Sequence, residues 1–228
     1  MSNSSQLPTR IRSLRTLARR PLTNPRKNAS QARSRATVDA LVEATARILV
    51  REGFERASTN RIAAQAGVSI GSLYQYFPGK EALVAAVIAR HNRDLMRVTG
   101  DALAQVAAAP IETGVRTLVA AAIEAHRIDP QLHRVLAEQT PRTGALADVE
   151  LFHREAHGLF RGYLEDHRDE LGDLDLDLAA FVCVTSIEAL THTAVIHRAD
   201  ILAGDAVATL VDEAARLVIG YLRPRAVA

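Results

Sequence analysis

The sequence contains one cysteine, Cys183, and no tryptophan among its 228 residues. A single thiol cannot form an internal disulfide, and it cannot build a zinc ribbon or an iron–sulfur centre. No uninterrupted apolar run is longer than the eight residues of 82–89, whereas a membrane-spanning helix needs about 20. We therefore expect a protein of the reducing cytoplasm that has no membrane partner and no metal site built on cysteine.

Acidic side chains are absent from residues 1–35, which carry nine basic ones. The net charge is +2 over residues 36–100 and −9 over residues 101–228. A basic front end attracts a polyanion, and an acidic back end is repelled by it. This asymmetry predicts contact with nucleic acid near the N-terminus. Two alternatives stay open for the tail by itself: a solubilising role, and an organellar leader, which is also rich in Arg and Ser.

Apolar residues make up 48% of the chain, enough to bury a core. They recur at steps of three and four residues, with Gly and Pro at the breaks, which predicts helices and no sheet. We expect a disordered basic tail over residues 1–34, a head of three helices over 35–80, and a larger helical domain over 81–228. The predicted helices cover about 36–51, 58–67, 69–77, 80–109, 111–128, 130–140, 145–170, 177–198 and 205–222.

The segment around Gly67 has the properties of a helix-turn-helix. Two short helices meet at this glycine, where Ala63 and Ala66 are small enough for a close crossing and Val68 fills the gap between the helices. The second helix opens with Ser69 as its N-cap and exposes hydroxyls and aromatic tips rather than aliphatic side chains. A helix that enters the major groove of DNA needs such a surface.

Residues 58–83, which read STNRIAAQAGVSIGSLYQYFPGKEAL, resemble the signature of TetR-family transcriptional regulators. The resemblance covers roughly residues 35–83. It implies an all-α protein with an N-terminal three-helix helix-turn-helix DNA-binding head and a larger C-terminal helical domain for ligand binding and dimerisation. The implied partners are a double-stranded DNA operator, a small-molecule effector and a second copy of the chain. An organellar leader becomes an unattractive explanation of the basic tail.

The resemblance also indicates which side chains meet the DNA backbone. Ser58 and Ser69 resemble the family's helix-capping residues, whose hydroxyls lie beside amide donors that attract phosphate. The residues that resemble its other backbone contacts are Tyr74, Tyr76 and Lys80. Arg61 is expected to face outward on the preceding helix, within reach of the backbone.

Base recognition is expected from Ile70, Ser72 and Gln75. A glutamine can pair with adenine through two hydrogen bonds, and an aliphatic side chain can meet a thymine methyl group. Alternatives stay open: Ser72 could touch a phosphate, Ile70 could be an ordinary exposed apolar residue, and the tyrosines at 74 and 76 could be packing aromatics.

The helical domain offers fewer signals. An apolar cavity with a few polar groups is the default ligand site, and the candidate lining residues are His126, Phe152, Phe160, Phe181, Cys183, Leu190 and His192. The last helix carries an apolar stripe that we expect to pair with helix 177–198 in a four-helix dimer interface; its members are Val207, Leu210, Val211, Ala214 and Val218.

Other chemistry finds little support in the sequence. His153 and His157 lie four residues apart, but no third ligand is apparent, so we expect no metal. Neither a nucleophile elbow nor a Gly-rich phosphate loop is present, so we expect no enzyme and no cofactor. The sequence thus predicts a ligand-responsive transcriptional repressor of a palindromic operator. The alternatives are a constitutive architectural DNA-binding protein and, more remotely, a helical enzyme acting on a small molecule.

Overall fold

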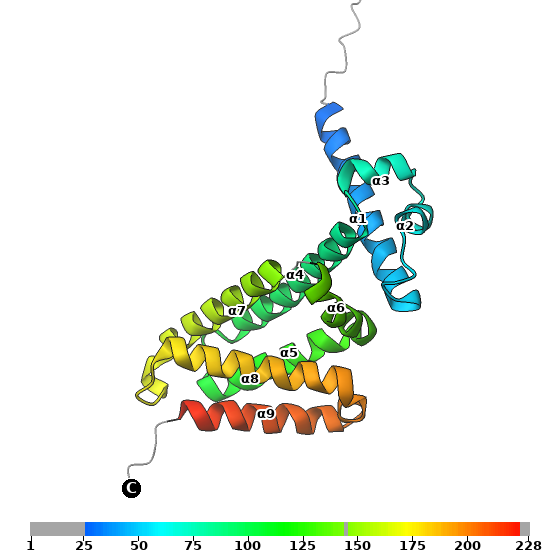
Figure 1. The fold of residues 1–228 in the computed structure, drawn as a ribbon. Helices are drawn as coiled ribbons and strands as arrows, with labels where there is room; N and C mark the ends of the chain where they lie inside the picture. Colours follow the sequence, from blue (N-terminus) through cyan, green and yellow to red (C-terminus); the bar gives the residue numbers. More distant parts are fainter. Residues whose placement is uncertain (1–25, 144–145, 224–228) are drawn as a thin grey trace, which may run out of the picture.

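The computed structural model describes residues 26–143 and 146–223, and every regular element in this part of the chain is helical (Figure 1). The prediction of an all-α fold is confirmed. The α-helices are α1 (Arg26–Glu52), α2 (Thr59–Ala66), α3 (Ile70–Tyr76), α4 (Lys80–Val106), α5 (Ile111–Arg127), α6 (Pro130–Thr143), α7 (Leu146–Asp166), α8 (Leu176–His197) and α9 (Ala206–Leu222). Two short 3-10 turns, η1 (Arg168–Glu170) and η2 (Ala199–Leu202), precede α8 and α9.

Helix α1 begins at Arg26, ten residues before the predicted start. The expectation of disorder up to residue 34 is therefore wrong for residues 26–34, while residues 1–25 lie outside the described part. The added segment contains no proline after Pro25 and is rich in Arg, Lys, Gln and Ala, which are good helix formers. It has no apolar stripe, so hydrophobic periodicity could not find it.

The head consists of α1, α2 and α3 packed on the first turns of α4. Its fully buried side chains include Leu41, Leu49, Ile62, Leu73 and Leu83. Helix α2 ends at Gly67, whose φ of 69° lies in the left-handed region that glycine adopts without strain. The next amide, that of Val68, donates to the carbonyl of Ala63. This turn sets the direction in which α3 leaves α2.

Two helices join the head to the rest of the molecule. Helix α4 buries Leu83 and Val87 in the head core, and near its other end it buries Ala102 in the core of the second domain. Helix α6 places Leu132 and Leu136 in the head core as well. Figure 1 shows the head at one end of α4, with α6 between the head and the remaining helices. Helices α4 and α6 are thus packed directly on the head core.

The second domain is built from α5, α7, α8 and α9 around a separate apolar core. Helix α8 is long and apolar enough to cross a membrane by length and composition alone. Here it packs against α5, α7 and α9, and residues such as Ala179, Cys183 and Ile187 are buried in the core. Burial inside the domain accounts for its apolar composition.

Candidate DNA-binding surface and effector cavity

Helix α3 is held at its start by serine hydroxyls. Ser69 is the N-cap, as predicted, and its Oγ accepts a hydrogen bond from the backbone amide of Ser72 at 3.0 Å. The two Oγ atoms lie 2.9 Å apart. Ser72 is half-buried, and its hydroxyl already contacts that of Ser69. It is therefore less available for a hydrogen bond to a base than a side chain without a partner. Leu73, one residue further, is fully buried and anchors the helix.

The outer face of α3 presents three of the expected contact residues to solvent. Ile70 is 38% exposed and Tyr74 is 54% exposed. The hydroxyl of Tyr74 lies 3.2 Å from Oγ1 of Thr59, the first residue of α2, a contact that the sequence analysis did not anticipate. Gln75 is exposed, and its amide has no hydrogen-bond partner among the described residues. Gln75 thus keeps its full hydrogen-bonding capacity for another molecule.

Tyr76 and Lys80 are engaged inside the head, in contrast to their expected role as free backbone contacts. Tyr76 is half-buried, and its hydroxyl donates to Oγ of Ser34 on α1 at 3.2 Å. The Lys80 ammonium donates to the carbonyl of Phe54 at 3.1 Å and lies 3.9 Å from the centre of the Phe54 ring. These partners lie 42 and 26 residues away in the chain, so local sequence patterns could not reveal them.

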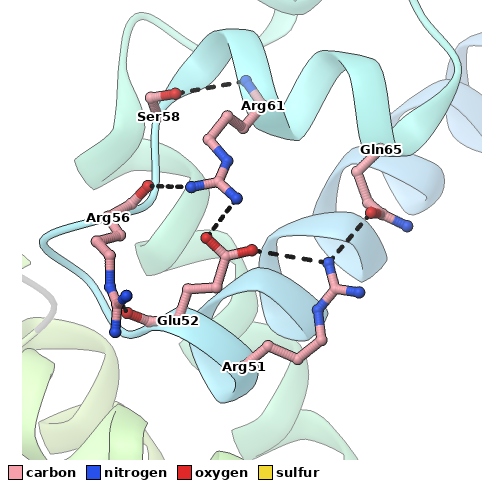
Figure 2. A network of polar contacts seen from close by, with 6 residues as sticks. All are labelled: Arg51, Glu52, Arg56, Ser58, Arg61 and Gln65. Atoms are coloured by element: carbon pink, nitrogen blue, oxygen red, sulfur yellow. Dashed lines mark hydrogen bonds and ion pairs between the residues drawn. The ribbon is translucent and has the colours of Figure 1, made fainter.

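Ser58 and Arg61 lie at the start of α2, in the polar network shown in Figure 2. Ser58 is the N-cap and accepts from the Arg61 amide at 3.4 Å. The Arg61 guanidinium pairs with Glu52 at 2.5 Å and donates to the carbonyl of Arg56 at 3.4 Å. Arg61 is thus folded back against the end of α1 rather than extended outward, because Glu52 lies within reach.

The same network fixes α2 relative to α1. Glu52 also lies 3.8 Å from Arg51, and Arg51 donates to the side chain of Gln65 at 3.3 Å. Both termini of α2 are therefore tied to the last turn of α1 (Figure 2). This arrangement positions the helix-turn-helix, and it partly neutralises the Arg61 charge.

Two exposed arginines on α1, Arg33 and Arg35, flank the residue that contacts Tyr76. Because Ser34 contacts Tyr76, they bring positive charge close to the last residue of α3. Sequence reasoning missed them as site residues, because Arg33 falls in the segment predicted to be a disordered tail and Arg35 stands at the predicted start of the head. The absence of acidic residues over 1–35 was the signal that pointed to them.

A cavity of about 390 Å³ lies between α4, α6, α7 and α8, with His126 of α5 in its wall. Of the predicted lining residues, His126, Phe152 and His192 line it. Phe160 instead lines an adjoining apolar compartment of about 70 Å³, which shares His126, Phe152 and Glu188 with the larger cavity. The two spaces are called the main cavity and the apolar compartment below.

Phe181, Cys183 and Leu190 line neither space. Phe181 is 52% exposed and Leu190 is 38% exposed, because they lie on the outer side of α8. Cys183 is packed in the domain core, where burial raises the pKa of its thiol to about 12. The expectation for these three residues is wrong because an apolar residue on a helix does not reveal what it faces.

A chain of three histidines crosses the main cavity, and two of its members, His91 and His133, were not anticipated. His91 Nε2 of α4 lies 3.0 Å from His133 Nδ1 of α6, and His133 Nε2 lies 2.9 Å from His192 Nδ1 of α8. Burial lowers the pKa of all three imidazoles, that of His133 to about 3. The chain is therefore neutral near pH 7, and it joins three helices through hydrogen bonds.

The apolar stripe on α9 that was expected to form the dimer interface faces the protomer's own core. Val211, Ala214 and Val218 are buried in the protomer's own core, and Val207 and Leu210 pack against that core. The stripe packs on α5, so the expectation that it meets a second copy is corrected. Periodicity identifies a buried face but not the element that covers it. The exposed apolar side chains of α8 and α9 are Leu178, Phe181, Leu190 and Leu217.

The two histidines considered for a metal site lie on α7. His153 Nε2 lies 3.4 Å from Oε2 of Glu188, and His157 packs edge-on against Phe181 with ring centres 5.6 Å apart. Among the described residues, no group of three or more His, Cys, Asp or Glu side chains is arranged to hold a metal ion.

Two family models match this architecture in the expected order. The model described as "Bacterial regulatory proteins, tetR family" matches residues 41–87, and the model described as "Tetracyclin repressor-like, C-terminal domain" matches residues 110–222. The first covers the helix-turn-helix and the start of α4, and the second covers α5 to α9. Together they span most of the described chain.

A curated relative and solved structures agree with these matches. The chain is 34% identical over 92 residues to the HTH-type transcriptional repressor DrrR1 of Streptomyces coeruleorubidus, a stretch of 40% of this chain that spans only about a third (32%) of the relative. A TetR-family regulator from Mesorhizobium loti superposes with a TM-score of 0.70 at 18% identity, covering 84% of this chain and 98% of that one.

The fatty acid regulator FadR of Bacillus subtilis, solved in complex with stearoyl-CoA, gives a TM-score of 0.63 at 18% identity and covers 81% of this chain and 98% of its own. These structural likenesses concern the fold, while the family matches concern the sequence. The helix-turn-helix with its capped α3, the helical second domain and both family models lead to one conclusion: the chain belongs to the TetR family of transcriptional regulators.

Proposed function

We propose that the protein is a homodimeric repressor that binds a palindromic operator through α3 and leaves it when a small molecule enters the main cavity. The observation that carries the proposal is the outer face of α3, where Gln75 is exposed with no hydrogen-bond partner among the described residues, next to Ile70 and Tyr74. A major-groove helix needs such unengaged donors, acceptors and apolar tips. The repressor DrrR1 supports the direction of regulation. Binding to chromosomal DNA would place the protein in the cytoplasm.

The proposed backbone contacts differ from those expected from the sequence alone. Ser58 and Ser69 remain candidates, because both are exposed hydroxyls at helix N-termini. Arg33 and Arg35 join them as exposed cations beside the end of α3. Lys80, Tyr76 and Arg61 contribute chiefly by holding the head together, through the contacts described above.

The proposed dimer interface uses the outward faces of α8 and α9, which run side by side in Figure 1. Leu178 and Phe181 near the start of α8, and Leu217 near the end of α9, are each more than half exposed. Large apolar side chains clustered on a surface mark an interaction site. A two-fold axis through this face would cover them and would set two recognition helices against successive turns of the DNA.

The histidine chain supports a route from the cavity to the head. His91 lies on α4 and His133 on α6, and α6 buries Leu132 and Leu136 in the head core. A ligand that separates these two imidazoles moves α6 against α4 and so changes the spacing of the heads. The ligand weakens operator binding by the factor with which it prefers the displaced conformer.

The test starts from purified protein and a random duplex library. Repeated selection is expected to enrich a palindrome, which the protein should bind about 10³-fold or more tightly than scrambled duplex at the same salt. Analytical ultracentrifugation should give one dimer per palindrome. Equal affinity for all duplexes would replace the proposal with the architectural alternative, in which the protein shapes DNA without selecting a sequence.

A further inference from the structure

The charge of the cavity walls is set by one side chain. Among the described residues that line the main cavity and the apolar compartment, Glu188 is the only Asp, Glu, Lys or Arg. It lies on α8 where the two spaces meet, and it lines both of them. A single carboxylate therefore decides which charge a ligand can carry there.

Glu188 has no fixed cation as a partner. Among the described residues its only ion-pair neighbour is His153, whose Nε2 lies 3.4 Å away and whose side chain is 46% exposed. Burial raises the pKa of Glu188, because a carboxylate loses hydration inside the cavity. A cationic ligand would replace, by ion pairing, the hydration that the Glu188 carboxylate loses on burial.

The neighbouring imidazoles are acceptors rather than cations. Nδ1 of His126 lies 2.7 Å from the carbonyl of Ala122, and since a carbonyl only accepts, Nδ1 carries the proton. Nε2 of His126 is then left with a free lone pair. Burial lowers the pKa of His126 as it does for His91, His133 and His192, so these rings are uncharged near neutral pH.

Next to this polar end, the apolar compartment is narrow. Its walls include Leu103, Leu118, Phe160, Val184 and Ile187, contributed by α4, α5, α7 and α8. A space of about 70 Å³ suits a slender hydrocarbon group rather than a second polar head. Phe152 lines both spaces, which puts an aromatic ring, a group that can attract a cation, at their junction.

We propose that the effector is an amphipathic organic cation, an alkyl or aryl ammonium or amidinium, with its charged head between Glu188 and His126 and its apolar group in the narrow compartment. The proposal names the ligand class of the effector site and rests on the ligand-responsive function proposed above. The ammonium N–H groups donate to the Glu188 carboxylate and to the His126 lone pair, and the alkyl group displaces water from aliphatic walls.

The same geometry disfavours an anionic head. A fatty carboxylate or a phosphate would meet Glu188 in surroundings of low dielectric constant, where like charges repel strongly. No Lys or Arg among the described lining residues would compensate. The effector class of this chain therefore differs from the acyl-CoA bound to FadR of B. subtilis, despite the shared fold.

Three probes that share one alkyl chain and differ only in the head test the proposal: octylammonium, octanol and octanoate. Calorimetric titration of the full-length protein, without DNA, at about pH 8 keeps the imidazoles neutral. Octylammonium is expected to bind at least about tenfold more tightly than either of the others, as charge pairing in a desolvated site allows. Equal or tighter binding of octanoate or octanol, or no binding of octylammonium up to about 1 mM, would overturn the proposal.

Two glutamate variants locate the effect. Glu188→Gln keeps the shape of the side chain and removes its charge, so it should abolish the preference for octylammonium and leave octanol binding unchanged. Glu155→Gln removes an exposed carboxylate from α7, outside both spaces, and should behave like the parent protein. A cation preference that survives in Glu188→Gln contradicts the assignment of the site.

The calorimetric titration tests the ligand class and the operator selection tests the repressor function, so a negative result in one can be distinguished from a negative result in the other. Selection of a palindrome together with preferred binding of octanoate would leave the repressor function standing and overturn the ligand class. Failure to select any DNA sequence would remove the repressor function, while the calorimetric comparison still measures the charge preference of the cavity.

Discussion

Lys80 reaches from the first residue of α4 back to Phe54, donating to its carbonyl at 3.1 Å and lying 3.9 Å from the centre of its ring. The contact closes the loop between α1 and α2 against the start of α4. It gives Lys80 a role inside the head. The ammonium is therefore engaged before any DNA arrives.

Replacing Lys80 by methionine should lower the free energy of unfolding by about 1–2 kcal/mol, because a charge-assisted hydrogen bond and a cation–π contact are lost. Urea titration measures the loss. The dependence of operator affinity on salt should stay unchanged. A decrease of about one in the slope of log K against log salt would instead show that Lys80 neutralises a phosphate. Lys80→Arg, which keeps the charge, is the matched control.

Gln75 is the residue of α3 most open to a base. Gln75→Ala should cost about 1–3 kcal/mol at one base pair of the selected operator and relax the preference there. Stability should not change, because the side chain has no partner within the described protein. Selection with the variant protein gives the new base profile. Gln131→Ala, at an exposed site on α6, should leave the profile intact, and an unaltered profile for both would exclude Gln75 from base recognition.

Features that depend on interactions between residues close in sequence could be predicted, and features that depend on residues distant in sequence could not. The N-caps Ser58 and Ser69 and the turn at Gly67 depend on bonds between residues three to five apart, and the prediction located all three. The family signature lies in this same local segment. The partners of Tyr76 and Lys80 depend on how α1 packs against α3 and α4, which no local pattern contains.

The cavity illustrates the same limit. His91 and His133 are single histidines on otherwise ordinary helices, and they become one hydrogen-bonded chain only when α4, α6 and α8 come together. The α9 stripe was correctly recognised as buried, but its covering element, α5, lies about 100 residues earlier in the chain. Helical periodicity predicts which face of a helix is buried, but the helix that covers this face depends on the packing of the whole domain.

Gly67 requires a left-handed backbone, with φ at 69°. Gly67→Ala should destabilise the head by about 1–2 kcal/mol, although nothing lies within 4 Å of the added methyl group, because the cost is conformational. Asparagine tolerates this region better, so Gly67→Asn should lose less. Thermal unfolding of both variants gives the comparison. Equal losses would show that steric contact rather than backbone strain sets the cost.

The buried imidazoles make stability depend on pH. Burial lowers the folded-state pKa of His91, His126, His133 and His192 below the ordinary 6.5, that of His133 to about 3. At His91 the carboxylates of Asp94 and Asp129 oppose this effect but do not outweigh it. Below about pH 6.5 the unfolded chain binds protons that the folded chain excludes, so stability is complete above that pH and falls as the pH drops toward the folded values.

Urea titrations between about pH 7.5 and pH 5 should therefore show a falling free energy of unfolding, with a ceiling of about 1.4 kcal/mol per pH unit for each histidine. His133→Gln, which can still form hydrogen bonds, should flatten the profile. His197→Gln changes an exposed histidine at the end of α8 whose charge affects only His192 of these four imidazoles, and it should alter the profile less than His133→Gln does. A His133→Gln profile as steep as that of the parent protein would contradict this explanation.

Tyr163 lies directly over Gly114 in the core of the second domain. A Cβ atom at Gly114 would come within 1.7 Å of the Tyr163 hydroxyl and 2.7 Å of the ring carbon that bears it. The hydroxyl itself is buried, and no described residue forms a hydrogen bond with it. Tyr163→Phe should therefore keep the stability or raise it by up to about 1 kcal/mol, because an unsatisfied polar atom is removed.

Gly114→Ala should instead lower the stability by about 1–3 kcal/mol, because the added methyl group forces the ring and its helix away from α5. In the double variant, Tyr163→Phe should relieve only part of this cost, since the clash with the ring carbon remains. Chemical denaturation of the three variants forms a double-mutant cycle. If Gly114→Ala were tolerated without loss, α5 and α7 could not be packed as closely as this contact requires.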